Sequence, residues 1–119
     1  MNRAELIRLG VLLEISDDYE EPEHVHQDLV ERLKICGLAV TSEDIQRSLI
    51  DLIQSGFAKA YWLGTDSDEE VQGLPPLDRF QDFFFRITDE GKRVLEVWRK
   101  EWPLDEEDEL LPGWSPPAE

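Results

Sequence analysis

Two histidines stand among acidic residues in the first quarter of the chain and could provide metal ligands. His24 and His26 are flanked by four carboxylates, those of Glu20, Glu21, Glu23 and Asp28. Imidazole and carboxylate groups commonly bind divalent metals. Histidines two positions apart point to different sides of a helix, however, so they would chelate one ion together only from an extended segment. We expect a solvated acidic helix start, in which the carboxylates favour the helix dipole.

A second acidic group has the opening spacing of a calcium-binding loop. Asp66, Asp68 and Glu70 alternate as the first three ligands of such a loop do. The sixth position is Val71 where glycine is needed, and the twelfth is Leu77 where glutamate is needed. We therefore predict no metal and no cofactor.

Nucleophilic catalysis finds little support in the sequence. The chain has no glycine-rich phosphate loop and no nucleophile elbow. Cys36, directly before Gly37, is typical of a small buried hydrophobic residue. We therefore expect a non-enzymatic protein. A single cysteine also excludes an internal disulfide, and no apolar segment is long enough for a membrane span, so we expect a cytoplasmic location.

Residues that could contact DNA lie in the middle of the chain. Arginine pairs with guanine edges and glutamine with adenine edges, which makes Arg47 and Gln46 candidates, with Arg79 as a third contact. The alternative is a solvated helix face, because acidic residues surround them. Their chemistry depends on the elements that present them.

The apolar pattern predicts three helices between the N-terminus and Gly56. Apolar side chains cover nearly the whole circumference of residues 2–15, which is typical of a helix buried in the fold or in a dimer interface. A second amphipathic helix runs over residues 25–37. Thr41, followed by Asp44, resembles a capping box that begins a third helix, and Gly56 ends it.

After the third helix the apolar period changes from 3.6 to 2. Residues 57–63 and 81–87 predict a two-stranded ribbon joined by a long loop, residues 64–80. Thr88 begins a last helix, which Pro103 ends. The richer aromatic face of the ribbon should pack on the helices; it comprises Phe57, Tyr61, Phe83 and Phe85.

Two segments are predicted to be solvated. Residues 16–23 are acidic and read as a linker. Residues 103–119 combine a block of like charges with a proline-rich end, which predicts a flexible tail beyond a domain of residues 1–102.

Two motifs carry a resemblance to a known family. The first comprises Thr41, Ser42, Glu43, Asp44, Ile45, Leu49, Leu52, Ile53, Gly56 and Phe57. The second comprises Phe85, Arg86, Ile87, Thr88, Asp89, Glu90, Gly91, Lys92, Arg93, Val94 and Leu95. In this order they resemble the winged helix-turn-helix superfamily, particularly MarR-like and PadR-like transcription regulators. The resemblance implies an α+β fold with a three-helix core, a two-stranded β wing and a C-terminal helix. It also implies a protein that dimerises through its terminal helices and binds DNA.

The charge argues against DNA. The chain has 12 Lys and Arg against 28 Asp and Glu, a formal net charge of −16. Phosphate contacts by basic residues supply most non-specific affinity for DNA. Both the third helix and the following loop carry more acidic than basic residues. A protein partner, especially a basic one, suits this field better.

Two apolar surfaces are candidates for protein contacts. If the aromatic ribbon face points inward, Trp62 and Phe84 form an outer platform beside Ala58 and Ala60, unless the last helix or the tail covers it. The last helix also carries an apolar stripe, and it is a candidate dimer interface: Leu95, Trp98 and Trp102.

The sequence thus predicts a non-catalytic winged-helix interaction module that acts mainly through protein contacts, with a homodimer left open. One alternative is a MarR-like or PadR-like DNA-binding regulator. A second is an acidic decoy that occupies a basic protein.

Overall fold

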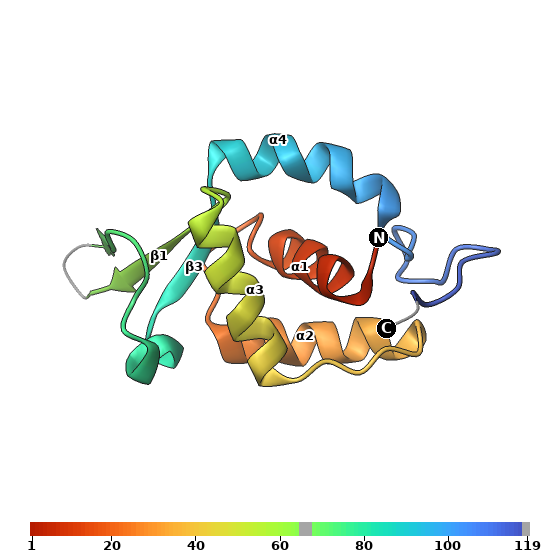
Figure 1. Cartoon of the computed structure of the whole chain (residues 1–119), viewed down its shortest axis with the longest axis horizontal. Coiled ribbons are helices and arrows are strands. Elements are labelled where there is room, and N and C mark those ends of the chain that lie inside the picture. The colour runs from red at the N-terminus through yellow and green to blue at the C-terminus, as the bar shows by residue number, and fades with distance from the viewer. Residues whose placement is uncertain (65–67, 118–119) are drawn as a thin grey trace.

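The described residues of the computed structural model, 1–64 and 68–117, form an α+β fold (Figure 1). Its α-helices are α1 (Arg3–Glu14), α2 (Pro22–Ile35), α3 (Ser42–Gln54) and α4 (Asp89–Trp98). A three-stranded antiparallel sheet contains β1 (Ala58–Leu63), β2 (Asp68–Glu70) and β3 (Phe84–Ile87), and two short 3-10 helices are η1 (Leu77–Asp82) and η2 (Arg99–Glu101). The order of these elements is compatible with a winged helix.

Helix α1 lies at the centre of the molecule, between α2, α3 and α4 (Figure 1). Its long apolar side chains before Leu13 are almost completely buried, and Leu13 is half-buried; the buried ones are Leu6, Ile7, Leu9, Val11 and Leu12. Asn2 caps the helix by accepting a hydrogen bond from the backbone N–H of Glu5, at 2.8 Å. Of the two expected locations for this helix, the core of the fold is the one observed.

The sheet has one strand more than the predicted ribbon. Strand β2 lies within residues 64–80, expected to be a loop, and pairs with β1 so that the strand order is β2-β1-β3. Its three residues are all acidic and exposed, so no apolar alternation marks them. The last strand begins at Phe84 instead of 81, because the preceding residues form η1 and bury Phe80 in the core.

The acidic linker after α1 covers the outer edge of β3. Glu20 and Phe85 exchange two backbone hydrogen bonds, of 3.0 and 2.8 Å, and the N–H of Ile87 donates to the carbonyl of Ile15 at 3.1 Å. The prediction of a simply solvated linker at 16–23 was therefore wrong for this segment. Its backbone supplies the partners that an edge strand otherwise lacks.

Helix α4 is held tightly against the end of α3. The hydroxyl of Thr88 caps α4 by accepting from the N–H of Gly91 at 3.0 Å, and it donates to the carbonyl of Gly56 at 2.7 Å. A Cβ atom on Gly91 would lie 2.2 Å from the carbonyl oxygen of Phe57. The glycine is therefore required by the closeness of two backbones.

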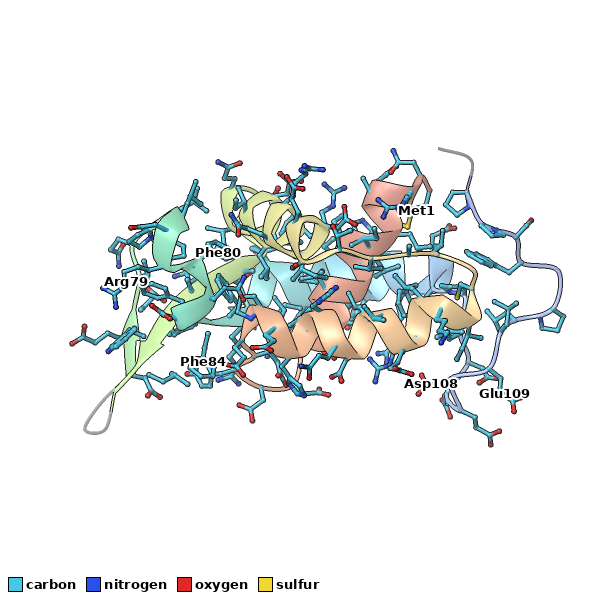
Figure 2. The ribbon with its side chains drawn as sticks, turned by 90° about the horizontal axis from the view of Figure 1, so that it is seen from below. Met1, Arg79, Phe80, Phe84, Asp108 and Glu109 are labelled. Carbon is cyan, nitrogen blue, oxygen red and sulfur yellow. The ribbon has the colours of Figure 1, made fainter. Side chains whose placement is uncertain are left out.

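Residues 103–117 follow a defined path along the opposite end of the molecule from the sheet (Figures 1 and 2). Leu104 is buried and forms a β-bridge with Leu110, and Trp114 packs against the core. The carboxylate of Asp108 lies 3.7 Å from the guanidinium of Arg32 on α2. Residues 118–119 of the predicted tail lie outside the described residues, and its flexibility stays a prediction.

Within the described ranges, no helix has both the length and the apolar character to cross a bilayer, and α2, the longest, has 14 residues.

Replacing Gly91 with alanine should strongly destabilise the protein. The new methyl group meets backbone atoms, which cannot move without shifting α4, and overpacking of this kind costs at least about 1–3 kcal/mol. Gly10→Ala is the matched control, since its Cβ meets side-chain atoms of Leu29 and Trp102, the nearest of them at 2.8 Å, instead of backbone atoms. Urea denaturation should give a clearly larger loss of unfolding free energy for Gly91→Ala. Equal losses in the two variants would contradict the close approach.

Candidate interaction surface

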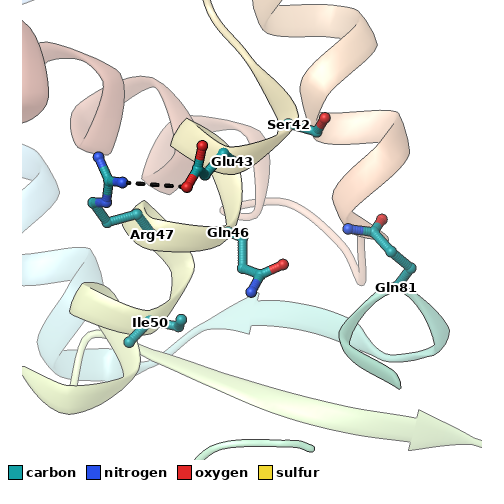
Figure 3. A pocket seen from close by; sticks show the side chains of 6 residues that line it. All are labelled: Ser42, Glu43, Gln46, Arg47, Ile50 and Gln81. Atoms are coloured by element: carbon teal, nitrogen blue, oxygen red, sulfur yellow. Dashed lines mark ion pairs between the residues drawn. The ribbon is translucent and has the colours of Figure 1, made fainter. Parts of the chain in front are cut away.

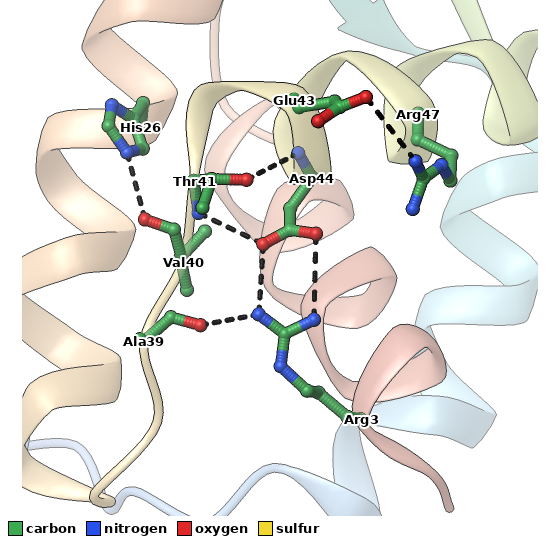
Figure 4. A network of polar contacts seen from close by, with 8 residues as sticks. All are labelled: Arg3, His26, Ala39, Val40, Thr41, Glu43, Asp44 and Arg47. Carbon is green, nitrogen blue, oxygen red and sulfur yellow. Dashed lines mark hydrogen bonds and ion pairs between the residues drawn. The ribbon is translucent and has the colours of Figure 1, made fainter. Parts of the chain in front are cut away.

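The N-terminus of α3 is fixed to α1 by a network of polar contacts (Figure 4). Thr41 and Asp44 form the predicted capping box, in which each side chain accepts a backbone hydrogen bond from the other residue. The guanidinium of Arg3 lies 2.9 Å from the Asp44 carboxylate and donates to the carbonyl of Ala39 at 2.6 Å. Hydrogen bonding to Arg3 lowers the pKa of Asp44 below its ordinary value. Helix α3 is thereby held in one orientation.

The outward face of α3 borders a hollow of about 430 Å³ (Figure 3). Five α3 residues and one residue of η1 line it: Ser42, Glu43, Gln46, Arg47, Ile50 and Gln81. The guanidinium of Arg47 lies 3.7 Å from the carboxylate of Glu43, so the positive charge is already paired. What remains for a ligand is two amides, a hydroxyl and a half-buried isoleucine.

A second hollow, of about 330 Å³, lies between the sheet and η1. It is lined by Trp62, Glu69, Glu70, Val71, Arg79 and Phe83. The indole of Trp62 is 41% exposed and makes an edge-to-face contact with Phe83, with ring centroids 5.6 Å apart. The guanidinium of Arg79 lies 5.7 Å from the Trp62 ring centroid and 3.4 Å from the carboxylate of Asp82.

The predicted outer platform does not form, because two of its members are buried. Ala58 and Ala60 pair with Ile87 and Phe85 and face the core, where they are almost fully covered. Their small side chains leave the space that the aromatic rings of Phe80 and Phe85 occupy, with centroids 4.9 Å apart. The expected orientation of β1 was therefore inverted.

The other residues of that platform separate onto opposite faces of the sheet. Trp62 lies on the core face beyond the end of the core, whereas Phe84 pairs with Tyr61 and lies on the outer face. Tyr61, predicted to face the helices, contacts Tyr19 edge to face, with ring centroids 5.0 Å apart. Burial is the main cause that raises the pKa of the Tyr61 hydroxyl. Phe57 precedes β1 and packs on Trp98 instead.

The candidate dimer residues are engaged within the chain. Leu95 is buried, and Trp98 contacts Phe57 with ring centroids 5.7 Å apart. The guanidinium of Arg8 lies 5.3 Å from the Trp98 ring centroid, and the ring of Trp102 packs over Gly10. The apolar surface on which the dimer expectation rested is therefore partly covered within the chain, with Trp98 and Trp102 half-buried. A homodimer stays a prediction, and the apolar surface of α1 and α4 no longer supports it strongly.

The three candidate DNA contacts are divided between the two hollows. Gln46 and Arg47, both on α3, line the first hollow, and Arg79 lines the second hollow, between the sheet and η1. Sequence reasoning missed Gln81, which η1 brings to the first hollow, and Asp82, which pairs with Arg79. The only signal for them was the proline pair directly before η1, a common start for a helical turn.

The two histidines face different surroundings. Nδ1 of His24 contacts the carboxylate of Glu20, and its Nε2 lies 3.6 Å from Asp28; the hydrogen bond with Glu20 is the main cause that raises the pKa of His24. His26 instead lies 3.0 Å from the carbonyl of Val40, in the turn before α3 (Figure 4). No cluster of three or more potential ligands is placed to hold a metal within residues 1–64 and 68–117.

The remaining sequence candidates are located as follows. Asp68 and Glu70 lie exposed on β2, whereas Asp66 falls outside the described residues. Cys36 is buried, and this burial raises the pKa of its thiol.

Comparison with known proteins finds no family model that matches the sequence and no curated protein that is significantly similar to it.

Replacing Asp44 with asparagine should lower stability near neutral pH and do so less in acid. The lowered pKa means that the Asp44 carboxylate stabilises the fold above its unfolded pKa, and that this contribution is lost as the pH falls through the folded pKa. Loss of the cap and the ion pair should cost about 1–2 kcal/mol at pH 7. Urea denaturation between pH 7 and pH 3 measures the difference from the wild type.

Glu43→Gln provides the control, because Glu43 is exposed and its pairing with Arg47 is loose. If Asp44→Asn lowers the free energy of unfolding by the same amount from pH 7 down to pH 3, the charge of Asp44 is not what stabilises α3.

Proposed function

We propose that this chain is a winged-helix domain that acts as a non-catalytic interaction module and contacts a partner protein through its acidic end. This acidic end consists of α3, η1 and the wing, which we define as the strands β1 and β2. The winged-helix assignment is supported by three packed helices, an antiparallel sheet and a following helix, in that order. The capped starts of α3 and α4 at Thr41 and Thr88 support it further.

The pairing of every basic side chain at the acidic end carries the proposal. Residues 41–83 contain nine acidic residues and three basic ones. Arg47 pairs with Glu43, Lys59 with Glu70 at 3.0 Å, and Arg79 with Asp82. Each basic side chain therefore has a carboxylate beside it that offsets its charge, and the excess of acidic residues at this end repels the duplex.

A DNA-binding regulator is the second candidate, because Gln46 and Arg47 lie side by side on the outward face of α3. Amide and guanidinium groups in this arrangement suit adenine and guanine edges. We consider DNA a less favourable partner than a protein, because base contacts add specificity to an affinity that phosphate contacts must first supply.

A duplex titration separates these two candidates. At about 150 mM salt, labelled genomic fragments should show no change in fluorescence anisotropy with protein concentrations that saturate ordinary non-specific binders, roughly 10⁻⁴ to 10⁻⁶ M. The double variant Glu43→Lys, Asp82→Lys should gain salt-sensitive binding, since it frees Arg47 and Arg79. Micromolar, salt-sensitive binding by the wild type would favour the regulator.

Site-specific photocrosslinking in cells tests the protein contact itself. A photoreactive amino acid at position 46 or 81 should give adducts that protease removes and nuclease does not. Position 27 is the matched control, since Gln27 is an exposed glutamine on α2, away from the acidic end. Nuclease-sensitive adducts at 46 or 81, or protein adducts equally strong at 27, would contradict the proposal.

A further inference from the structure

The hollow beneath the wing has an aromatic wall and an acidic rim. Trp62 and Glu69 are direct partners across β1 and β2, so their side chains share the face of the sheet that looks onto η1. Val71 follows on that face, where its N–H donates to the carbonyl of Ala60 at 2.9 Å. Phe83 closes the inner end against the indole. The hollow is therefore a shaped apolar surface with a carboxylate at its border.

The indole of Trp62 already holds a cation from the same chain. The guanidinium of Arg79 lies near its ring, in the range where a cation is attracted by the electron-rich face of an aromatic ring. Arg79 is itself largely exposed, and its carboxylate partner Asp82 is exposed too. Exposed contacts of this kind are weak, so an incoming cation can replace Arg79.

The charge around the hollow favours a second cation. Residues 68–83 contain five acidic side chains and one basic one, that of Arg79. The ammonium of Lys59 is held by Glu70, and this hydrogen bond raises the pKa of Lys59. Within residues 1–64 and 68–117, no basic side chain pairs with Glu69. Glu69 is thus available beside an aromatic ring that accepts cations.

We propose that a lysine or arginine side chain from a basic segment of a partner protein enters this hollow, stacks on Trp62 in place of Arg79 and pairs with Glu69. This assignment rests on the proposed function and names the chemistry that the partner presents. A nucleic acid offers phosphates that Glu69 and its acidic neighbours repel. An apolar segment would leave the carboxylate at the border without a partner.

Titration with a capped hexa-arginine peptide at about 150 mM salt tests the proposal. The indole N–H signal of Trp62 in a ¹⁵N-edited spectrum should shift with peptide, while that of Trp114, at the opposite end of the molecule, should not. Trp62→Leu should weaken binding by roughly 2- to 5-fold, the effect of losing one exposed cation–π contact. Glu69→Gln should weaken it more than Glu106→Gln, which removes the same charge from the C-terminal segment.

Removing the internal cation gives a result of opposite sign. Arg79→Gln should tighten peptide binding by about 2- to 5-fold, because the ring no longer has to release Arg79. Arg47→Gln removes the same charge from α3 and controls for the general increase in negative charge. Only the excess of Arg79→Gln over Arg47→Gln supports exchange of one cation for another.

Several outcomes would overturn the assignment. Peptide binding that leaves the Trp62 signal unmoved, or that responds equally to the paired variants, would show general attraction to an acidic surface. A Trp62 shift that depends on protein concentration without peptide would make a second copy of this chain the occupant. Neither result alters the crosslinking at positions 46 and 81, so the proposed function is judged separately. Glu69→Gln and Arg79→Gln change exposed side chains, so they decide the matter if Trp62→Leu fails to fold.

Discussion

The burial of α1 on every side is the constraint on which the rest of the structure depends. A helix of 12 residues can be covered all round only if several elements pack against it, and α2, α3 and α4 do so. Charged residues near its two ends fix their positions: Arg3 contacts Asp44 at the start of α3, and Glu14 contacts Arg32 on α2. The carbonyl of Ile15 then joins the helix to β3. The acidic end therefore takes the position of α3 from α1, against which α3 packs.

The pairing of charges gives the acidic end a different character from an ordinary acidic surface. A net charge of −16 repels other anions at long range, but at short range each basic residue of α3 and the wing is held beside a carboxylate. Ion pairs between exposed groups contribute little to stability. In the contact proposed here they offset the positive charges that would attract phosphate, whereas the carboxylate of Glu69 has no basic partner within residues 1–64 and 68–117.

The predictable parts of the structure are those written in local sequence. The starts of α3 and α4 follow from Thr41 and Thr88, whose side chains cap the helices that they precede, and the burial of α1 follows from its apolar circumference. A helix start needs only residues a few positions apart, so a single sequence contains the required information. Gly91 stands in the motif that resembles the winged-helix superfamily, and its steric reason appears only when α4 meets Phe57.

The missed parts depend on contacts between distant segments. Arg3 and Asp44 are 41 residues apart, and nothing near either residue indicates the pair. Strand β2 consists of three acids, a composition that propensity assigns to a loop, and it is a strand only because β1 supplies its partners. The predicted orientation of β1 was wrong because alternation alone favours the face with the larger side chains as the buried one. Here the alanines are inside, and the rings of Phe80 and Phe85 fill the volume that they leave.

The two edges of the sheet are closed by different means, and this difference has a consequence for self-assembly. The backbone around Glu20 occupies the edge of β3, which leaves few donors or acceptors there for another chain. Among residues 1–64 and 68–117, no backbone pairs with the outer edge of β2, which carries the side chains of Asp68, Glu69 and Glu70. Like charges would face each other if two such edges met, a known defence against amyloid-like strand stacking. The sheet therefore has one edge closed by backbone and one guarded by charge, and strand-to-strand pairing of two copies is disfavoured at both.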